Sequence, residues 1–201
     1  MSLFITFEGI DGTGKSTQAK ILLKSLATLG IPCLITREPG GSPLAEKIRE
    51  LIINEEMDEL TEFFLFYAAR SDHIIKTIKP ALDAGLVVIC DRFYDSTSAY
   101  QSNLDEYLHF DAMEAVTDEG EFTPDLTFIL DMDPKRAMER LDARGDKNSF
   151  DRRPLEWFET TRKEFLEIGD DPRCYIIDAD RPVDEIHEEI QAIVLERIRV
   201  G

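Results

Sequence analysis

The sequence predicts an α/β protein in which helices cover both faces of a five-stranded parallel sheet, a three-layer α/β/α arrangement. Apolar runs of strand length alternate with longer segments of helical periodicity along the 201 residues. The first two strands are joined by a helix, and a helical crossover makes neighbouring strands parallel. The run at 86–90 is apolar throughout, which is typical of a strand buried on both faces.

Each expected element follows from this periodicity and from the Gly, Pro and polar residues that end it. Strands are expected at 3–7, 31–36, 86–90, 126–131 and 174–177. Helices are expected at 16–29, 44–54, 60–79, 103–119, 134–143, 155–168 and 183–199. Because the chain contains no internal repeat and no linker, we expect residues 1–201 to form a single domain with a short Arg-bearing lid at approximately 140–154.

The loop between the first strand and the first helix carries the Walker A spacing, in which Gly9 is followed five residues later by Gly14-Lys15-Ser16. Its glycines let consecutive N–H groups point into one concavity, and the following helix adds its positive end there. A Gly-rich turn that binds nothing is the alternative. The pattern predicts a P-loop NTPase-type fold with a phosphate site. The expected nucleotide-binding residues of this loop are Gly9, Ile10, Asp11, Gly12, Thr13, Gly14, Lys15, Ser16 and Thr17.

The overall charge and composition limit the classes of molecule that the protein is expected to bind. The formal net charge is −18, which argues against a nucleic-acid polymer but not against a small anion in a locally basic site. No window approaches 18 uninterrupted apolar residues, so we expect no membrane partner, and we expect no signal or transit peptide before the first strand. The three cysteines are far apart, and we expect buried free thiols in a reducing cytoplasm.

Charged residues also follow the second and third strands, at the edge of the sheet where open α/β proteins bind ligands. Arg37 and Pro39 lie in a Pro- and Gly-rich loop, for which a plain surface loop is the alternative. Asp91 and Arg92 end a central strand, where charges are costly unless they are paired or used. The Ser16 hydroxyl is the expected Mg²⁺ ligand of the phosphate loop.

The helix at 60–79 is apolar on more than one stripe, so one face is expected against the sheet and the other against a second subunit. Within it, Phe66 and Arg70 are four residues apart and share a face. Such a pair can stack on a base and clamp a phosphate, whereas a core aromatic beside a salt bridge is the commoner reading.

The segment after the fourth strand contains a cationic cluster in an otherwise acidic protein. Its members are Arg140, Arg144, Arg152 and Arg153. Exposed salt bridges with neighbouring acidic residues are the alternative. Because mobile Arg-bearing loops recur in phosphoryl transfer, we expect a lid that closes over phosphates.

Two classes of nucleotide-binding protein are disfavoured. The chain has no Asn-Lys-x-Asp for reading guanine, and a motor or AAA-type ATPase would usually show adjacent acidic residues where this chain has Asp91 and Arg92. Arg70, Arg92 and the Arg-rich segment suggest a second anion that faces ATP. This layout is that of a small-molecule phosphotransferase.

The order of motifs along nearly the whole chain resembles the bacterial and archaeal thymidylate kinases. The matching segments are FEGIDGTGKST at 7–17, TREPGG at 36–41, FYAAR at 66–70, DRF at 91–93, STSAYQ at 96–101 and PDLTFILD at 124–131. The resemblance implies transfer of the ATP γ-phosphoryl group to dTMP, giving dTDP, with Mg²⁺ and without a covalent intermediate. It also implies a homodimer.

The resemblance implies a role for individual residues. Phe66 would stack on thymine, Arg70 would hold the base and the acceptor phosphate region, and Tyr100 would pack against the deoxyribose. The implied substrate-binding residues are Asp11, Arg37, Pro39, Phe66, Arg70, Arg92, Ser96, Thr97, Tyr100 and Gln101. The implied catalytic residues are Lys15, Asp91, Arg92, Arg144, Arg152 and Arg153, and Arg140 would join the ATP site. Asp91 would also serve the Mg²⁺ ion through bound water.

The chain departs from the family pattern at several positions. Phe93 replaces a Tyr or His, Thr97 stands where some members have Asn, and the spacing of the lid arginines differs. Gly12 stands where some relatives carry an Arg that reaches the transferring phosphate, so that charge is expected from the arginines of 140–153. Another nucleoside monophosphate or deoxynucleoside kinase is the nearest alternative function, and a nucleotide-binding regulatory ATPase is a more distant one.

Overall fold

The computed structural model describes residues 2–117, 122–145, 150 and 153–200, and it confirms the predicted parallel α/β fold. The strands are β1 (Leu3–Glu8), β2 (Cys33–Arg37), β3 (Val87–Asp91), β4 (Leu126–Asp131) and β5 (Cys174–Asp178). They form one sheet in the order β2-β3-β1-β4-β5, and all its strand pairs are parallel.

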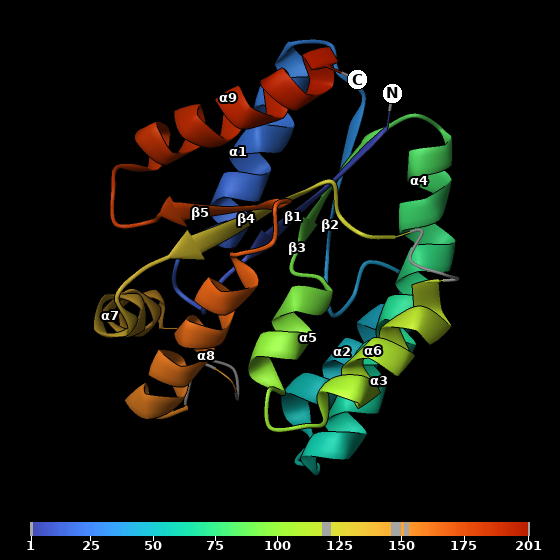
Figure 1. Cartoon of the computed structure of the whole chain (residues 1–201), viewed down its shortest axis with the longest axis vertical. Coiled ribbons are helices and arrows are strands. Elements are labelled where there is room, and N and C mark those ends of the chain that lie inside the picture. The colour runs from blue at the N-terminus through green and yellow to red at the C-terminus, as the bar shows by residue number, and fades with distance from the viewer. Residues whose placement is uncertain (1, 118–121, 146–149, 151–152, 201) are drawn as a thin grey trace.

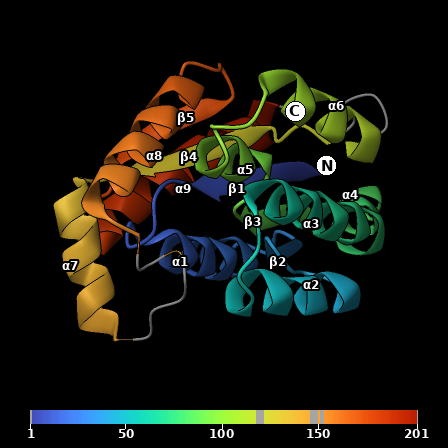
Figure 2. The same cartoon turned by 90° about the horizontal axis from the view of Figure 1, so that it is seen from below.

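Helices pack on both faces of this sheet (Figure 1). They are α1 (Lys15–Thr28), α2 (Pro43–Asn54), α3 (Glu59–His73), α4 (Lys79–Asp83), α5 (Tyr94–Tyr100), α6 (Glu106–Thr117), α7 (Pro134–Arg144), α8 (Leu155–Ile168) and α9 (Val183–Val200). Figure 1 shows α1 and α9 stacked on one side of the sheet, with α4, α5 and α8 on the other. In both views α7 and α4 lie at opposite ends of the molecule (Figure 2).

Strand β1 forms the centre of the sheet and is buried along its whole length. Its side chains alternate between two hydrophobic cores, as the two-residue period of a strand requires. Leu3, Ile5 and Phe7 belong to the core that α1 and α9 cover, whereas Phe4 belongs to a second core with Phe93. The Phe4 and Phe93 rings meet edge to face with centroids 5.0 Å apart, so Phe93 serves packing.

The prediction of one uninterrupted helix over 60–79 is wrong. α3 ends at His73 and is followed by one wide π-helical segment (Ile74–Ile78), after which α4 begins with Pro80 in its first turn. Proline has no N–H to donate and its ring crowds the preceding turn, which explains why regular α-helix does not run through. The widened turn places Ile74 and Ile78 in the second core.

A short helix, α5, follows β3 where the sequence indicates only a polar, hydroxyl-rich segment. Ser and Thr have low helix propensity, so the segment carries no helical signal of its own. All three cysteines are free, but only Cys90 is buried, and Cys33 and Cys174 are half-buried. In the described part of the chain, no helix combines the length and apolar character that a membrane span requires.

Candidate functional site

The carboxyl ends of β1, β2 and β3 meet at one edge of the sheet, and the predicted site residues gather there. Parallel pairing aligns Phe7 with Asp91 and Arg37 with Asp91, so the segments that follow these strands begin side by side. The phosphate loop (residues 9–17), the loop after β2 and the turn at Arg92 therefore surround the same space.

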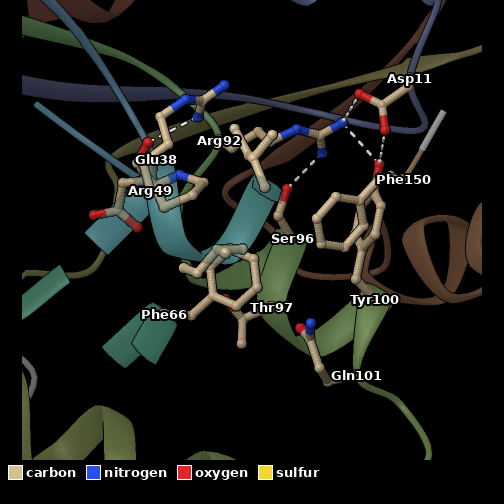
Figure 3. Close-up of a pocket in the computed structure, with 13 residues that line it drawn as sticks. Asp11, Glu38, Arg49, Phe66, Arg92, Ser96, Thr97, Tyr100, Gln101 and Phe150 are labelled. Atoms are coloured by element: carbon tan, nitrogen blue, oxygen red, sulfur yellow. Dashed lines mark hydrogen bonds and ion pairs between the residues drawn. The ribbon is translucent and has the colours of Figure 1, made fainter. Parts of the chain in front are cut away.

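The first hollow at this edge, here called the aromatic pocket, is drawn in Figure 3. Predicted residues that line it are Asp11, Pro39, Phe66, Arg92, Ser96, Thr97, Tyr100 and Gln101. Further lining residues, which the sequence reasoning missed, are Glu38, Arg49, Ile52, Ile53 and Phe150. The pocket combines aromatic and aliphatic walls with a few charged groups, which is typical of a small-molecule site.

Arg92 lies at the end of this pocket, where Figure 3 shows it between Asp11, Tyr100 and Ser96. Its Nη2 donates to Asp11 Oδ1 at 2.8 Å and to the Tyr100 hydroxyl at 2.7 Å. Its Nη1 donates to Ser96 Oγ at 2.7 Å, and its guanidinium lies 4.8 Å from the Tyr100 ring centroid. The guanidinium is therefore fixed in one orientation before any ligand enters.

The backbone of Arg92 is also unusual, because its φ of 73° lies in the left-handed region. A non-glycine residue held there costs on the order of 1–3 kcal/mol, and the surrounding structure must supply that energy. Such outliers concentrate at functional sites, which agrees with the position of Arg92 in the pocket.

The charge of Asp11 is maintained by its neighbours. Burial alone would raise the pKa of this carboxyl, but the charges of Arg92 and then Lys15 outweigh burial and lower the pKa to about 2. Asp11 therefore remains ionised at neutral pH and accepts from both Arg92 and the Tyr100 hydroxyl, the latter at 3.0 Å.

Arg70 lies under the pocket, 1% exposed, and is held by buried groups. Its Nε donates to Glu38 Oε2 at 2.8 Å and its Nη2 donates to Thr97 Oγ1 at 2.8 Å. Glu38 Oε1 lies 2.9 Å from His73 Nδ1, and His73 Nε2 lies 2.6 Å from Thr36 Oγ1. Within the described residues the buried Nη1 of Arg70 has no hydrogen-bond partner.

A second hollow, here called the loop pocket, lies over the phosphate loop. Its lining residues are Asp11, Gly12, Gly14, Lys15, Ser16, Thr17, Arg140 and Arg144. Lys15 Nζ donates to the Ile10 carbonyl at 2.8 Å, which keeps the side chain folded over the loop. Burial, together with the nearby charge of Arg92, lowers the pKa of Lys15 to about 8.

Arg140 and Arg144 reach the loop pocket because α7 packs directly on the phosphate loop. α7 starts at Pro134, where the Asp133 carboxylate accepts from the backbone N–H of Lys135 at 3.0 Å and caps the helix. Gly12 has φ +91°, and a Cβ at this position would lie 2.4 Å from the Ala137 carbonyl oxygen. Glycine is therefore required here for the helix to approach the loop backbone.

A third hollow continues from the loop pocket toward the start of α9, and we call it the side pocket. It is bounded by the outer wall of the phosphate loop and by the loop after β5, and its lining includes Gln18, Arg140, Ala179 and Arg181. No sequence motif marks Ala179 and Arg181 in the loop after β5, and Gln18 on α1 lies just beyond the phosphate-loop motif. Together the loop pocket and the side pocket form one extended space.

Ser16 and Asp91 also come together, since Ser16 Oγ donates to Asp91 Oδ2. A hydroxyl and a carboxylate at the end of a phosphate loop are the oxygen ligands that Mg²⁺ prefers, so the pair fits this ion. Among the described residues there is no cluster of three or more His, Cys, Asp or Glu side chains with metal-site geometry. Mg²⁺ is usually held by one or two carboxylates with phosphates and water, so such a cluster is not needed.

The structure does not bring every predicted residue to the site. Arg37 pairs with Glu46 at 2.8 Å, is about half exposed, and lines a hollow beside Ser16 and Asp91 instead of the aromatic pocket. Arg153 lies over the Trp157 ring at 5.6 Å from its centroid, outside the lining of the loop pocket as described. Arg152 lies outside the described residues, and so does most of the predicted lid between Gly145 and Arg153.

The missed pocket residues carry weak sequence signals. Glu38 belongs to the TREPGG segment, but the sequence reasoning gave that segment's role to Arg37. Arg49, Ile52 and Ile53 form a helical stripe on α2, which is indistinguishable from a core-facing stripe until the tertiary structure is known.

Comparison with known proteins identifies relatives over nearly the whole chain. The model of the family described as thymidylate kinase matches residues 7–190. The thymidylate kinase of Ruegeria pomeroyi is 44% identical, covering 98% of this chain and 96% of the relative. That of Pseudomonas fluorescens is 41% identical, covering 96% and 94%. A crystal structure of thymidylate kinase from Ehrlichia chaffeensis superposes with a TM-score of 0.79 at 34% identity, covering 96% of this chain and 98% of that one.

We predict that Gly12→Ala weakens nucleotide binding by about 1–3 kcal/mol, because the new methyl group forces α7 away from the loop. Isothermal titration with a non-hydrolysable ATP analogue measures the change. Gly30→Ala is the matched control, since Gly30 also has a positive φ but its Cβ would meet nothing within 4 Å. Unchanged affinity in Gly12→Ala would contradict the contact between α7 and the loop.

Proposed function

The chain belongs to the thymidylate kinase family, and we propose that it carries out the family's reaction with the residues of the aromatic, loop and side pockets and with Mg²⁺. The family membership carries the activity itself, which is phosphorylation of dTMP to dTDP with ATP as the phosphoryl donor. The geometry of the three pockets supports a distinct role for each group of residues that lines them.

One observation supports the placement of donor and acceptor above all others. Asp11 lines both the aromatic pocket and the loop pocket, so the two spaces meet at the Asp11–Arg92 pair. A monophosphate whose base occupies the aromatic pocket would present its phosphate to Arg92, next to the phosphate loop. The acceptor and donor phosphates would then face each other, so that the phosphoryl group would be transferred directly, without a covalent enzyme intermediate.

The aromatic pocket suits a nucleoside monophosphate. Phe66 would stack on a flat base, and the Phe150 ring meets the Phe66 ring edge to face with centroids 6.4 Å apart. The free Nη1 of Arg70 lies beside Thr97 and would donate to a base carbonyl. Tyr100, packed against Trp157 at a centroid distance of 5.1 Å, would form the wall beside the sugar.

Preorganised positive charge would supply most of the rate. Lys15, Arg92, Arg140 and Arg144 surround the point where the two pockets meet. Each reduces the repulsion between the two anions, and a fixed charge needs no reorganisation during the reaction. Arg152 and Arg153 remain predicted contributors from the lid.

Mg²⁺ would be held by Ser16 directly and by Asp91 through water, together with the ATP phosphates. When bound, it neutralises charge on the phosphate oxygens. In the structure the Ser16 hydroxyl donates to Asp91, and this contact would be replaced when Ser16 turns toward the ion.

The acceptor panel tests the proposed function. Turnover is measured with ATP and Mg²⁺ against dTMP, dUMP, dCMP, AMP and GMP, and we expect a clear preference for dTMP. A preference for another monophosphate would make the chain a different nucleotide kinase. ATP loss that does not depend on any acceptor would instead support a regulatory ATPase.

We predict that Arg92→Ala lowers kcat by about 2–4 kcal/mol of transition-state stabilisation, roughly 30- to 1,000-fold, as for loss of one preorganised donor. Steady-state kinetics measure the loss, and thermal unfolding checks that the variant is folded. Arg37→Ala is the comparison, because Arg37 pairs with Glu46 away from the pocket and its loss should leave the KM for dTMP unchanged. A near-normal rate in Arg92→Ala would remove its assigned role.

We also propose that the chain forms a homodimer through α3 and α6. Large apolar side chains are exposed there, namely Leu60 and Phe64 on α3 and Tyr107 and Phe110 on α6. An apolar surface of this kind marks an interaction site. Light scattering of the wild type should give twice the monomer mass, and Phe64→Glu should give the monomer. Leu29→Glu, at an equally exposed leucine after α1, should remain dimeric.

The cell compartment and the wider partners follow from composition. Three free cysteines and no disulfide among the described residues support a reducing compartment, so we propose the cytoplasm. A net charge of −18 supports small-molecule rather than nucleic-acid partners. Cell fractionation tests the first point.

A further inference from the structure

We propose that Glu8 is a positioning residue, which holds Arg92 where it meets the acceptor phosphate. This inference rests on the proposed function and deepens it. Glu8 ends β1, is completely buried, and is absent from the described lining of the aromatic, loop and side pockets. A buried carboxyl is costly, so its contacts identify what it does.

Both oxygens of Glu8 bind groups of the Arg92 turn. Oε1 accepts the backbone N–H of Phe93 at 2.7 Å, and Oε2 accepts the Ser96 hydroxyl at 2.5 Å. The Ser96 oxygen in turn accepts from Arg92 Nη1 at 2.7 Å. The carboxyl therefore holds the guanidinium through one hydroxyl and holds the backbone immediately after Arg92.

The backbone contact matters because Arg92 has φ 73°. Its own N–H donates to the Phe7 carbonyl at 3.0 Å, and the Cys90 thiol donates to the Arg92 carbonyl at 3.0 Å. These two bonds and the Phe93 N–H bond to Glu8 fix the turn from both sides. Glu8 is the member of this set that also reaches the Arg92 side chain, through Ser96.

The surroundings of Glu8 exclude a simple role as a surface or salt-bridge carboxylate. The nearby Asp95 is paired with Arg173 by two contacts of 2.8 Å, so Arg173 is already used. Burial, and then the charge of Asp95, raise the pKa of Glu8 to about 8. The free-energy cost of burying this carboxyl is partly offset by the hydrogen bonds that it accepts from Phe93 and Ser96.

The first test uses the kinetics of the acceptor nucleotide to distinguish a positioning role of Glu8 from a general effect on the stability of the protein. In Glu8→Ala we expect kcat/KM for the acceptor to fall about 10- to 100-fold, with the KM for ATP within about twofold of wild type. Glu8→Gln keeps an acceptor for Phe93 N–H and a polar group for Ser96, and it should recover activity to within about fivefold. The side chain in Glu8→Asp is too short to reach both donors, so we expect this variant to have a lower kcat/KM for the acceptor and an unchanged KM for ATP.

The second test asks whether Glu8 acts through Arg92. In an Arg92→Ala background, Glu8→Ala should lower kcat/KM for the acceptor by less than about twofold further, since the positioned group is absent. The proposal would be overturned if the losses in kcat/KM caused by Glu8→Ala and Arg92→Ala multiplied in the double variant. Wild-type acceptor kinetics in Glu8→Ala, or an equal rise in its KM for ATP, would also overturn it. If Glu8→Ala does not fold, the contrast between Glu8→Gln and Glu8→Asp decides the question.

Thr6→Val is the matched control on the same strand. Thr6 is fully buried, its hydroxyl pairs with Thr127 at 2.8 Å, and no described hydrogen bond joins it directly to Arg92, Phe93 or Ser96. It should lower the melting temperature without changing acceptor kinetics. All variants are measured with the acceptor that the wild type prefers, so preference for a nucleotide other than dTMP revises the function but leaves the Glu8 test intact. A wild type with no acceptor-dependent turnover would overturn both.

Discussion

The hydrogen-bonded contact between Arg92 and Asp11 is the interaction on which the rest of the site depends. It joins the turn after β3 to the phosphate loop after β1, and it exists because these two strands are neighbours in the sheet. The parallel register, with Phe7 opposite Asp91, places the two loops at the same level along the strand axes. The order of strands therefore determines the distance between the acceptor and donor pockets, and the side chains refine it.

Buried ion pairs lie near this contact, and burying their charges costs free energy that an apolar core would not. The Glu38–Arg70 pair and the Asp95–Arg173 pair are both almost fully buried, and breaking such a pair usually costs several kcal/mol. An apolar core of the same volume is often equally stable. These pairs lie directly beneath pocket residues, Arg70 under Thr97 and Asp95 beside Ser96, so we interpret them as supports for the pocket wall.

The sequence was sufficient for the fold and for the motif-bearing part of the site. The five strands were predicted within about two residues of their observed ends. The signal is strongest for β1, β3 and β4, because parallel strands that are buried along nearly their whole length give strong apolar runs. The helix at 60–79 was predicted without its interruption, since periodicity does not reveal where Pro80 forces a wider turn. Within TREPGG, the exposed Arg37 appeared functional, whereas its buried neighbour Glu38 faces the pocket. Burial of that kind depends on contacts with α3, which is distant in sequence.

The residues from α2 and the loop after β5 illustrate the same limit. Arg49 and Arg181 line pockets only because tertiary packing brings their elements to the carboxyl edge of the sheet. Their own sequence neighbourhoods are ordinary amphipathic or polar segments. Short-range patterns report the local environment, and a site assembled from many segments requires the three-dimensional arrangement.

The absence of a side chain at Gly12 has a mechanical consequence. With backbone touching backbone, α7 lies directly against the phosphate loop, so the fold itself brings Arg140 and Arg144 to the loop pocket. Two of the positive charges at this site thus depend on the close approach that glycine permits. A relative with a larger residue at this position has to place the same charge by a different route.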